Sequence, residues 1–283
     1  QTAENMALDG NGHSLTGNND LDSLSIAKGK TFSAANVGGK YTVSDTAPAD
    51  GSIYAEFTDT DGQKKYAVSA GGFERLLGSG VASTGVLSNK GMLEVADSAF
   101  VGNQVGYGGA GVHNAGLITR LNADFLKNEG SWGAALYNAG VITVFEGDFI
   151  GNTAEYYGGA VFNMGEIGTM GGFYAGNTAT PYGGALFNGK DAIGNIGTIE
   201  KITGIFSGNN AKYGSAIFND GEVGAVAGAG FYYNGLESGY MGGAIYNSGT
   251  MDIRSSEFAG NASSYGGAVA SYGTGEIADS VFR

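Results

Sequence analysis

The chain has 283 residues, with 54 glycines, two prolines and no cysteine. Its apolar fraction of 42% and aromatic fraction of 11% argue against a disordered chain, and the absence of a three-residue glycine period excludes collagen. The formal net charge is −13, and lysines and arginines do not cluster, so we expect no binding to nucleic acid or to an anionic membrane surface. Without cysteine, the chain can form neither disulfides nor thiolate metal sites.

Residues 1–80 carry short strand-like runs at irregular spacing. Runs at 41–43, 53–57 and 65–68 read as strands, and Asp61-Gly62 is a favourable hairpin turn. We expect 1–80 to form irregular first coils of a solenoid, with a β-hairpin excursion over about 40–70. Such an excursion near the N-terminus would protect the first open strand edge.

Residues 81–283 repeat with a period of about 25, which predicts one continuous solenoid of about eight coils. The first landmark of each unit is Asn-x-Gly or a close variant, and it recurs after 25, 24, 25, 25, 31 and 28 residues. Its asparagines are Asn89, Asn114, Asn138, Asn163, Asn188, Asn219 and Asn247. The second landmark is Phe-x-x-Asn or a one-residue variant, which begins at Phe100, Phe125, Phe149, Phe173, Phe206, Phe231 and Phe258.

This period fits three short strands and three corners, with rungs stacked at about 4.8 Å. A β-propeller blade needs about 40–50 residues, and the helical side of leucine-rich repeats is missing. The predicted fold is therefore all-β, a right-handed parallel β-helix, with the handedness set by the preference of parallel crossovers.

Between the landmarks, the unit reads Tyr-Gly-Gly-Ala. An aliphatic residue follows, then a residue that is usually aromatic, and then Asn. Strand alternation buries either the aliphatic and Asn or the Ala and the ring. Polar-tipped rings favour an outward position, and stacked asparagines can bond their own copies. We therefore expect an exposed contact row, with a core ring stack as the alternative. The row is His113, Tyr137, Phe162, Phe187, Phe218 and Tyr246.

A second aromatic column precedes the glycine pair. It has two interpretations: packing of a corner against the next rung, or a stacking platform for sugar rings. The column is Trp132, Tyr157, Tyr182, Tyr213 and Tyr265, with Tyr107 and Tyr240 offset by one residue.

The sequence offers few groups for catalysis or metal binding. If the Phe of Phe-x-x-Asn points inward, Asp124 and Asp148 lie about 5 Å apart on one outer face. That distance suits a retaining glycosidase, but we expect both carboxylates to be solvated and without a neighbouring base. Asp124, Glu146 and Asp148 are a weak calcium candidate. No histidine cluster, nucleophile motif or phosphate loop is present, so we expect neither an enzyme nor a cofactor.

The pairing of Gly-Gly-Ala-(Ile/Val/Leu) with Phe-x-x-Asn resembles the repeats of polymorphic outer membrane proteins, which are autotransporter passengers. Examples are Gly158-Gly159-Ala160-Val161 and Gly183-Gly184-Ala185-Leu186, and the resemblance covers about 100–283. It implies a secreted or surface-exposed adhesin whose partner is a component of a host-cell, bacterial or matrix surface. No apolar run is long enough for a membrane helix, so we expect no membrane insertion of this segment.

Two alternatives to the adhesin remain open. One is a structural subunit that binds copies of itself, with coils stacking end to end into extracellular filaments. The other is a β-helix that binds or cleaves carbohydrate.

Overall fold

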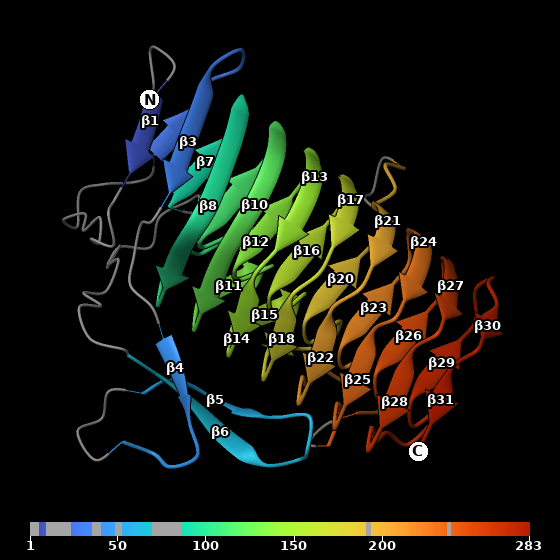
Figure 1. The fold of residues 1–283 in the computed structure, drawn as a ribbon. Helices are drawn as coiled ribbons and strands as arrows, with labels where there is room; N and C mark the ends of the chain where they lie inside the picture. The colour runs from blue at the N-terminus through green and yellow to red at the C-terminus, as the bar shows by residue number, and fades with distance from the viewer. Residues whose placement is uncertain are drawn as a thin grey trace.

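The computed structural model describes residues 6–9, 24–35, 41–48, 53–69, 86–190, 194–236 and 239–283. These residues form strands and turns without a helix, and they build a right-handed parallel β-helix of about eight coils (Figure 1). The predicted fold class is thereby confirmed. The predicted boundary near residue 80 lies outside the described residues.

Sheet A is one wall of the helix and contains nine described parallel strands, which stack along the helix axis. The strands pair in register, so that Leu136 lies beside Val161 and Asn138 beside Asn163. In stacking order they are β2 (Leu24–Ile26), β7 (Leu87–Asn89), β9 (Val112–Asn114), β12 (Leu136–Asn138), β16 (Val161–Asn163), β20 (Leu186–Asn188), β23 (Ile217–Asn219), β26 (Ile245–Asn247) and β29 (Val269–Ser271).

Sheet B is larger and divides at β10, which pairs with both β13 and β14. It begins with β1 (Met6–Asp9), β3 (Thr31–Ala35), β8 (Met92–Val101) and β10 (Leu117–Leu126). Its first limb is β13 (Val141–Glu146), β17 (Glu166–Met170), β21 (Thr198–Ile202), β24 (Glu222–Ala227), β27 (Thr250–Arg254) and β30 (Ile277–Ala278). Its second limb is β14 (Asp148–Ile150), β18 (Phe173–Ala175), β22 (Ile205–Ser207), β25 (Gly230–Tyr232), β28 (Glu257–Ala259) and β31 (Val281–Phe282).

A short third sheet closes the coils between sheets B and A. It consists of β11 (Glu129–Trp132), β15 (Thr153–Tyr157) and β19 (Thr178–Ala179), all parallel. At the N-terminal end of the stack, β2 pairs with β7 and β3 pairs with β8. The described strands between residues 6 and 35 therefore join the same stack.

The core consists of side-chain columns that run along the helix axis. Aliphatic residues of sheet A, such as Leu136 and Val161, are fully buried against the rings of sheet B. Those rings stack face to face at centroid distances of 4.7–5.0 Å. The ring column is Phe100, Phe125, Phe149, Tyr174, Phe206, Phe231, Phe258 and Phe282.

This column confirms the predicted ladder but corrects one member, because Tyr174 and not Phe173 occupies it. Tyr174 pairs with Phe149 in register, and its hydroxyl donates to the carbonyl oxygen of Gly171 at 3.0 Å, so the polar tip is satisfied inside the core. Phe173 lies on the outer face instead. The repeat is therefore Phe/Tyr-x-x-Asn.

Two ladders of asparagines, all of them buried except Asn261, lie at the corners of the coils. Each Nδ2 donates to the Oδ1 of the next coil, at 2.7–2.8 Å in the first ladder and 2.8–3.0 Å in the second. The first ladder comprises the asparagines that end strands β7 to β26 of sheet A, and the second is Asn103, Asn128, Asn152, Asn177, Asn209, Asn234 and Asn261. Buried amides thus meet their hydrogen-bonding requirement by bonding their own copies.

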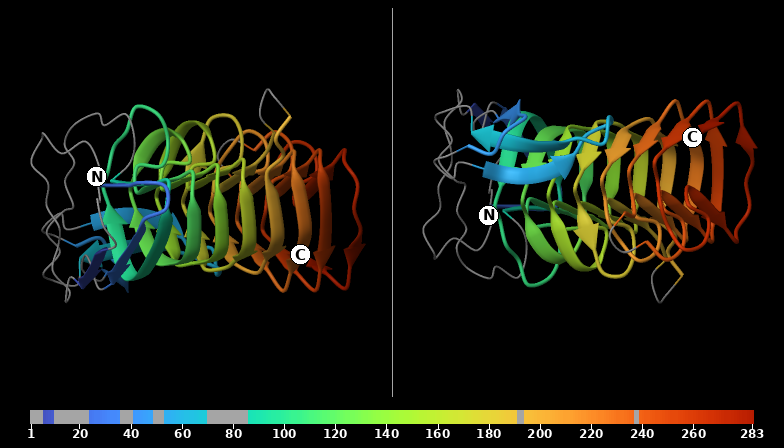
Figure 2. Two further views of the ribbon diagram at one scale, coloured as in Figure 1. Left: turned by 90° about the horizontal axis from the view of Figure 1, so that it is seen from above. Right: turned by 90° about the horizontal axis from the view of Figure 1, so that it is seen from below.

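The predicted hairpin exists and belongs to a three-stranded antiparallel sheet, which we call the strap. It consists of β4 (Tyr41–Ser44), β5 (Ile53–Thr58) and β6 (Lys64–Ser69), in the order β4-β6-β5. The prediction that it protects the first open edge is wrong. The strap lies along the side of the helix, across several coils of the second limb (Figure 2).

Apolar contact explains this position of the strap. Ala55, Phe57 and Ala67 form a separate small cluster with outward residues of sheet B, among them Leu126 and Ile150. Further along, the Ser207 hydroxyl donates to the Thr58 carbonyl oxygen at 2.7 Å. The outer surface of these coils is therefore itself apolar and needs a cover.

Candidate functional site: an outer aromatic surface

The six predicted rings form one outward row on sheet A. Pairs of neighbouring rings stack at centroid distances of 4.7–5.2 Å, from His113 to Tyr246. On each strand, the aliphatic residue before the ring and the Asn after it are buried in the core. Strand alternation then places the ring on the opposite face. The outward orientation is confirmed, and the alternative of a core stack is wrong.

The second column stands beside this row. Tyr157 and Tyr182 stack at 5.4 Å and Tyr182 and Tyr213 at 5.2 Å. The two predicted offsets are also found: Gly108, not Tyr107, pairs with Trp132, and Met241, not Tyr240, pairs with Tyr213.

The two columns interlock into one continuous surface, which we call the aromatic surface. From Trp132 to Tyr213, each second-column ring packs against the ring of the first row one coil later, as Tyr157 does with Phe187 at 4.9 Å and Tyr182 with Phe218 at 4.8 Å. Aromatic pairs at these distances gain stabilisation beyond simple burial. The second column therefore packs the corner of one coil against the next coil, which is the first of the two interpretations given above.

Exposure varies along the aromatic surface. Phe162 and Phe187 are only 7% and 8% exposed, because the second column covers them. Tyr107 and Tyr240, the two offset residues, are 44% and 41% exposed. Along the stacked stretch, neighbouring rings cover each other's faces and leave their edges outward. Sugar rings stack on open aromatic faces, so this stretch does not favour a sugar platform at Tyr157 and Tyr182.

Two buried ring nitrogens of this surface have no hydrogen-bond partner among the described residues: Nδ1 of His113 and Nε1 of Trp132. Burial, with the positive charge of Lys90 nearby, lowers the pKa of His113 below its ordinary value. A pKa lowered from 6.5 leaves the imidazole neutral at pH 7. The row is therefore uncharged along its whole length.

Sequence reasoning missed Lys212. Its Nζ atom lies 5.5 Å from the ring centroids of both Tyr213 and Tyr240. The available signal was a lysine directly before a second-column tyrosine, which occurs in no other repeat unit.

The predicted carboxylates lie elsewhere, on sheet B: Asp124 on β10, Glu146 at the end of β13 and Asp148 at the start of β14. Asp124 and Asp148 are neighbours as expected, and the Asp148 amide donates to Asp124 Oδ1 at 3.2 Å. The expectation that both are solvated is wrong for Asp148, because the strap half-buries it and the Tyr41 hydroxyl donates to its Oδ2. Burial raises the pKa of Asp148. No three His, Asp or Glu side chains of the described residues gather as a metal site requires, so Asp124, Glu146 and Asp148 do not form one.

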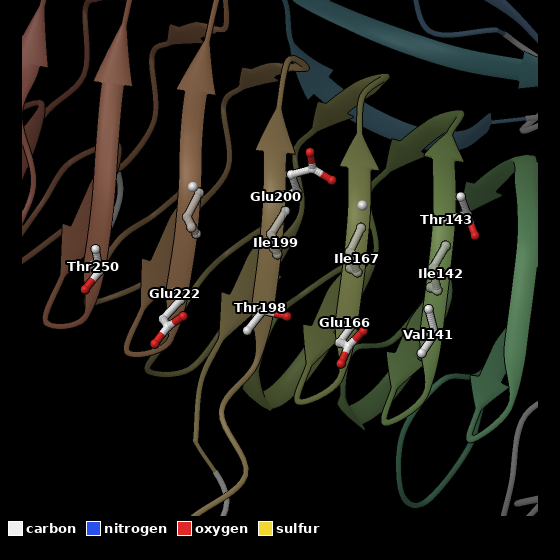
Figure 3. Close-up of a pocket in the computed structure, with 13 residues that line it drawn as sticks. Val141, Ile142, Thr143, Glu166, Ile167, Thr198, Ile199, Glu200, Glu222 and Thr250 are labelled. Carbon is white, nitrogen blue, oxygen red and sulfur yellow. The ribbon is translucent and has the colours of Figure 1, made fainter.

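A shallow groove of about 490 Å³ crosses the outer face of the first limb (Figure 3). Its floor includes Gly168 and Gly224, which flank Glu200 and leave gaps beside it, and Figure 3 shows the Glu200 side chain reaching toward β17. Glu166 and Glu222 line its other edge. All three carboxylates are exposed to solvent. The groove therefore makes a weaker candidate than the aromatic surface.

The chain matches no protein-family model, no curated protein and no solved structure. The fold is thus shown by the coordinates alone, and the resemblance to autotransporter passengers stays a prediction. Within the described ranges, no helix has the length and apolar character needed to span a membrane.

Proposed function

We propose that this chain is a non-catalytic binding scaffold on the outside of a cell, an adhesin-like β-helix that attaches through its aromatic surface. One observation carries the proposal: two interlocking columns of rings lie outside the core. The core is already closed by its aliphatic residues, its ring column and the asparagine ladders. The outer rings therefore add a surface that the solenoid does not need for its own closure.

The chemistry of this surface suits protein contact. Tyrosine and tryptophan supply rigid contact area with a polar tip, and they are enriched at binding hot spots. Tyr137, Phe218 and Tyr246 are half-buried, so part of each ring remains accessible. The extracellular location rests on the repeat's resemblance to surface passengers. The partner would be a component of a host-cell, bacterial or matrix surface.

The test is an attachment assay with fluorescent beads that carry the purified chain, offered to host cells, bacteria and matrix-coated wells. Tyr137→Ser combined with Tyr157→Ser removes two rings that both pack against Phe162, while leaving the buried Phe162 and Phe187 in place. We expect attachment to the best surface to fall at least tenfold, because anchors of this kind contribute about 2 kcal/mol or more each.

The matched control is Tyr66→Ser, which removes a half-buried tyrosine from the strap and not from the aromatic surface. It should attach like the unchanged chain. Equal attachment by the double variant and the unchanged chain would refute the proposal. Light scattering on the same samples detects self-association, which would make a second copy the partner.

A further inference from the structure

Tyr240 departs from the regular second column. In its coil, Met241 takes the register position between Tyr213 and Tyr265. The Lys212 carbonyl oxygen accepts from the amides of both Tyr240 and Met241, at 2.8 and 3.2 Å. This local bulge moves the Tyr240 ring out of the stack, as bulges commonly re-aim side chains.

The displaced ring stands perpendicular to its neighbours. The Tyr240 plane makes angles of 82° with Tyr213 and 73° with Tyr265, at centroid distances of 5.8 and 5.3 Å. In the regular column, by contrast, Tyr157 and Tyr182 are nearly parallel at 5°. At this corner Tyr240 and Tyr265 are 41% and 57% exposed, so part of each ring is open to a ligand.

A cation already lies at this corner. Lys212 Nζ is 5.5 Å from the centroids of both Tyr213 and Tyr240, within the range of cation–π attraction. Among the described residues, no ion pair involves Lys212. Ring faces, and not a carboxylate, therefore hold this ammonium group, and Tyr240 remains 41% exposed to incoming molecules.

We propose that Tyr213, Tyr240 and Tyr265 form an aromatic cage that binds a quaternary ammonium group, with Lys212 as the internal cation that the ligand displaces. This inference deepens the proposed binding function by naming a ligand class at one corner of the aromatic surface. It commits to a methylated ammonium and not to a sugar or an aliphatic side chain.

The preference for a quaternary ammonium follows from hydration. A lysine ammonium is compact and strongly hydrated, so it loses much of its hydration when it enters a ring corner. A trimethylammonium group is larger, donates no hydrogen bonds to water and presents methyl groups to the ring faces, which is why aromatic cages recognise it. The net charge of −13 further attracts a cation from a distance.

Two sources share this chemistry: choline headgroups, free or as phosphocholine, and trimethylated lysine side chains. The experiment separates them with three probes in NMR titrations: choline, phosphocholine and a short peptide with trimethyllysine. The neutral isostere 3,3-dimethylbutan-1-ol serves as the ligand control, because it keeps the shape of choline without the charge.

We expect saturable shifts around residues 212–213 and 240 with at least one cationic probe, and at least tenfold weaker binding of the neutral isostere. Tyr240→Leu should weaken binding on the order of tenfold, through loss of one cation–π wall. Lys212→Gln should strengthen it severalfold, since the competing cation is gone.

Tyr107→Leu is the matched control, because Tyr107 is also offset, is similarly exposed and packs edge-on against Trp132. Within the described ranges, the cation–π contacts involve Lys212 and not Tyr107. It should leave the affinity unchanged. Equal binding of the isostere, no effect of Tyr240→Leu, or no binding of any cationic probe would overturn the cage. None of these results would affect bead attachment through Tyr137 and Tyr157, so the two proposals fail separately.

Discussion

At the scale of single residues, Asn163 shows how one buried amide joins several coils. Its Nδ2 donates to Asn188 Oδ1 at 2.8 Å and to the carbonyl oxygens of Gly165 and Thr198 at 3.2 Å. Its Oδ1 accepts from Asn138 Nδ2 at 2.7 Å. The side chain is fully buried, so no water can replace a lost partner.

Asn163→Ala should therefore lower the free energy of unfolding by on the order of 3 kcal/mol, because it leaves buried donors and acceptors unsatisfied. Urea denaturation followed by circular dichroism measures this change. The matched control is Asn122→Ala, since Asn122 makes a surface hydrogen bond of 3.3 Å to Asp97 and should cost less than about 1 kcal/mol. Similar losses in the two variants would contradict a structural role for the ladder.

Asp148 should make the free energy of unfolding depend on pH. Burial raises its pKa above the ordinary 3.8, so the folded chain holds this proton at pH values where the unfolded chain has released it. The contribution of Asp148 to the free energy of unfolding therefore falls as pH rises through the interval between 3.8 and the raised pKa. Asp148→Asn removes this dependence and still offers an acceptor to Tyr41.

We expect Asp148→Asn to gain stability relative to the unchanged chain at pH 7, with the difference shrinking toward pH 4. Urea midpoints across that range measure it. Asp252→Asn is the control, because this carboxylate lies in an exposed pair with Arg254. A difference that grows toward acid pH would mean that the Tyr41 hydrogen bond outweighs burial.

At the scale of elements, the strap docks on a track of glycines. The residue before each second-ladder asparagine has a positive φ. In the three coils that β5 crosses, this residue is a glycine: Gly151, Gly176 or Gly208. A Cβ atom on Gly151 would lie 2.7 Å from the Ala55 Cβ, and one on Gly208 would lie 2.8 Å from the Thr58 Cβ. The equivalent positions on either side are Lys127 and Tyr233, with φ of 51° and 53°. The backbone conformation therefore tolerates side chains, and the glycines make room for β5.

Gly151→Ala should accordingly lift β5 from the coils. Hydrogen exchange measured by mass spectrometry should show faster exchange in peptides that cover β5 and β6. Gly228→Ala is the matched control, since Gly228 has a similar φ of 68° and a Cβ there would meet nothing within 4 Å. Both variants incur the strain of a left-handed alanine, so only the first should release the strap. Unchanged exchange in Gly151→Ala would rule out this docking track.

At the scale of the whole molecule, the regular solenoid could be predicted from sequence because each coil repeats the same pattern of inward and outward residues. The ladder through Asn163 and the outward row through Tyr137 both follow from the period and strand alternation. The prediction that Phe173 belongs to the core ring column was wrong because Tyr174, the next residue, is also aromatic. Only the register between coils shows that Tyr174 is the ring that points inward. The strap's position could not be predicted, since the glycines beneath β5 look like ordinary corner glycines. The cage at Tyr240 depends on a bulge that leaves only a one-residue offset in sequence.

The strap also changes how the molecule holds together. In a solenoid each coil contacts only its neighbours, so stability is a sum of local terms. The strap bridges coils from Val101 to Ser207, and its hairpin tip lies so close to Tyr233 that a Cβ atom on Gly62 would be 2.8 Å from that ring. Coils that are not neighbours thereby share one cover.

Phe57→Ala tests this coupling, because Phe57 is 5% exposed and packs edge-on against Phe173 at 5.6 Å. Its removal should cost about 3–5 kcal/mol locally. In native-state hydrogen exchange, β14 and β18 should lose protection together with β5, while β26 and β27 beyond the hairpin tip keep theirs. Glu56→Ala, which removes an exposed neighbour on the same strand, should change none of these rates. If Phe57→Ala speeds exchange equally in all coils, the β-helix opens as one cooperative unit; if it affects β5 alone, the strap covers the coils without coupling them.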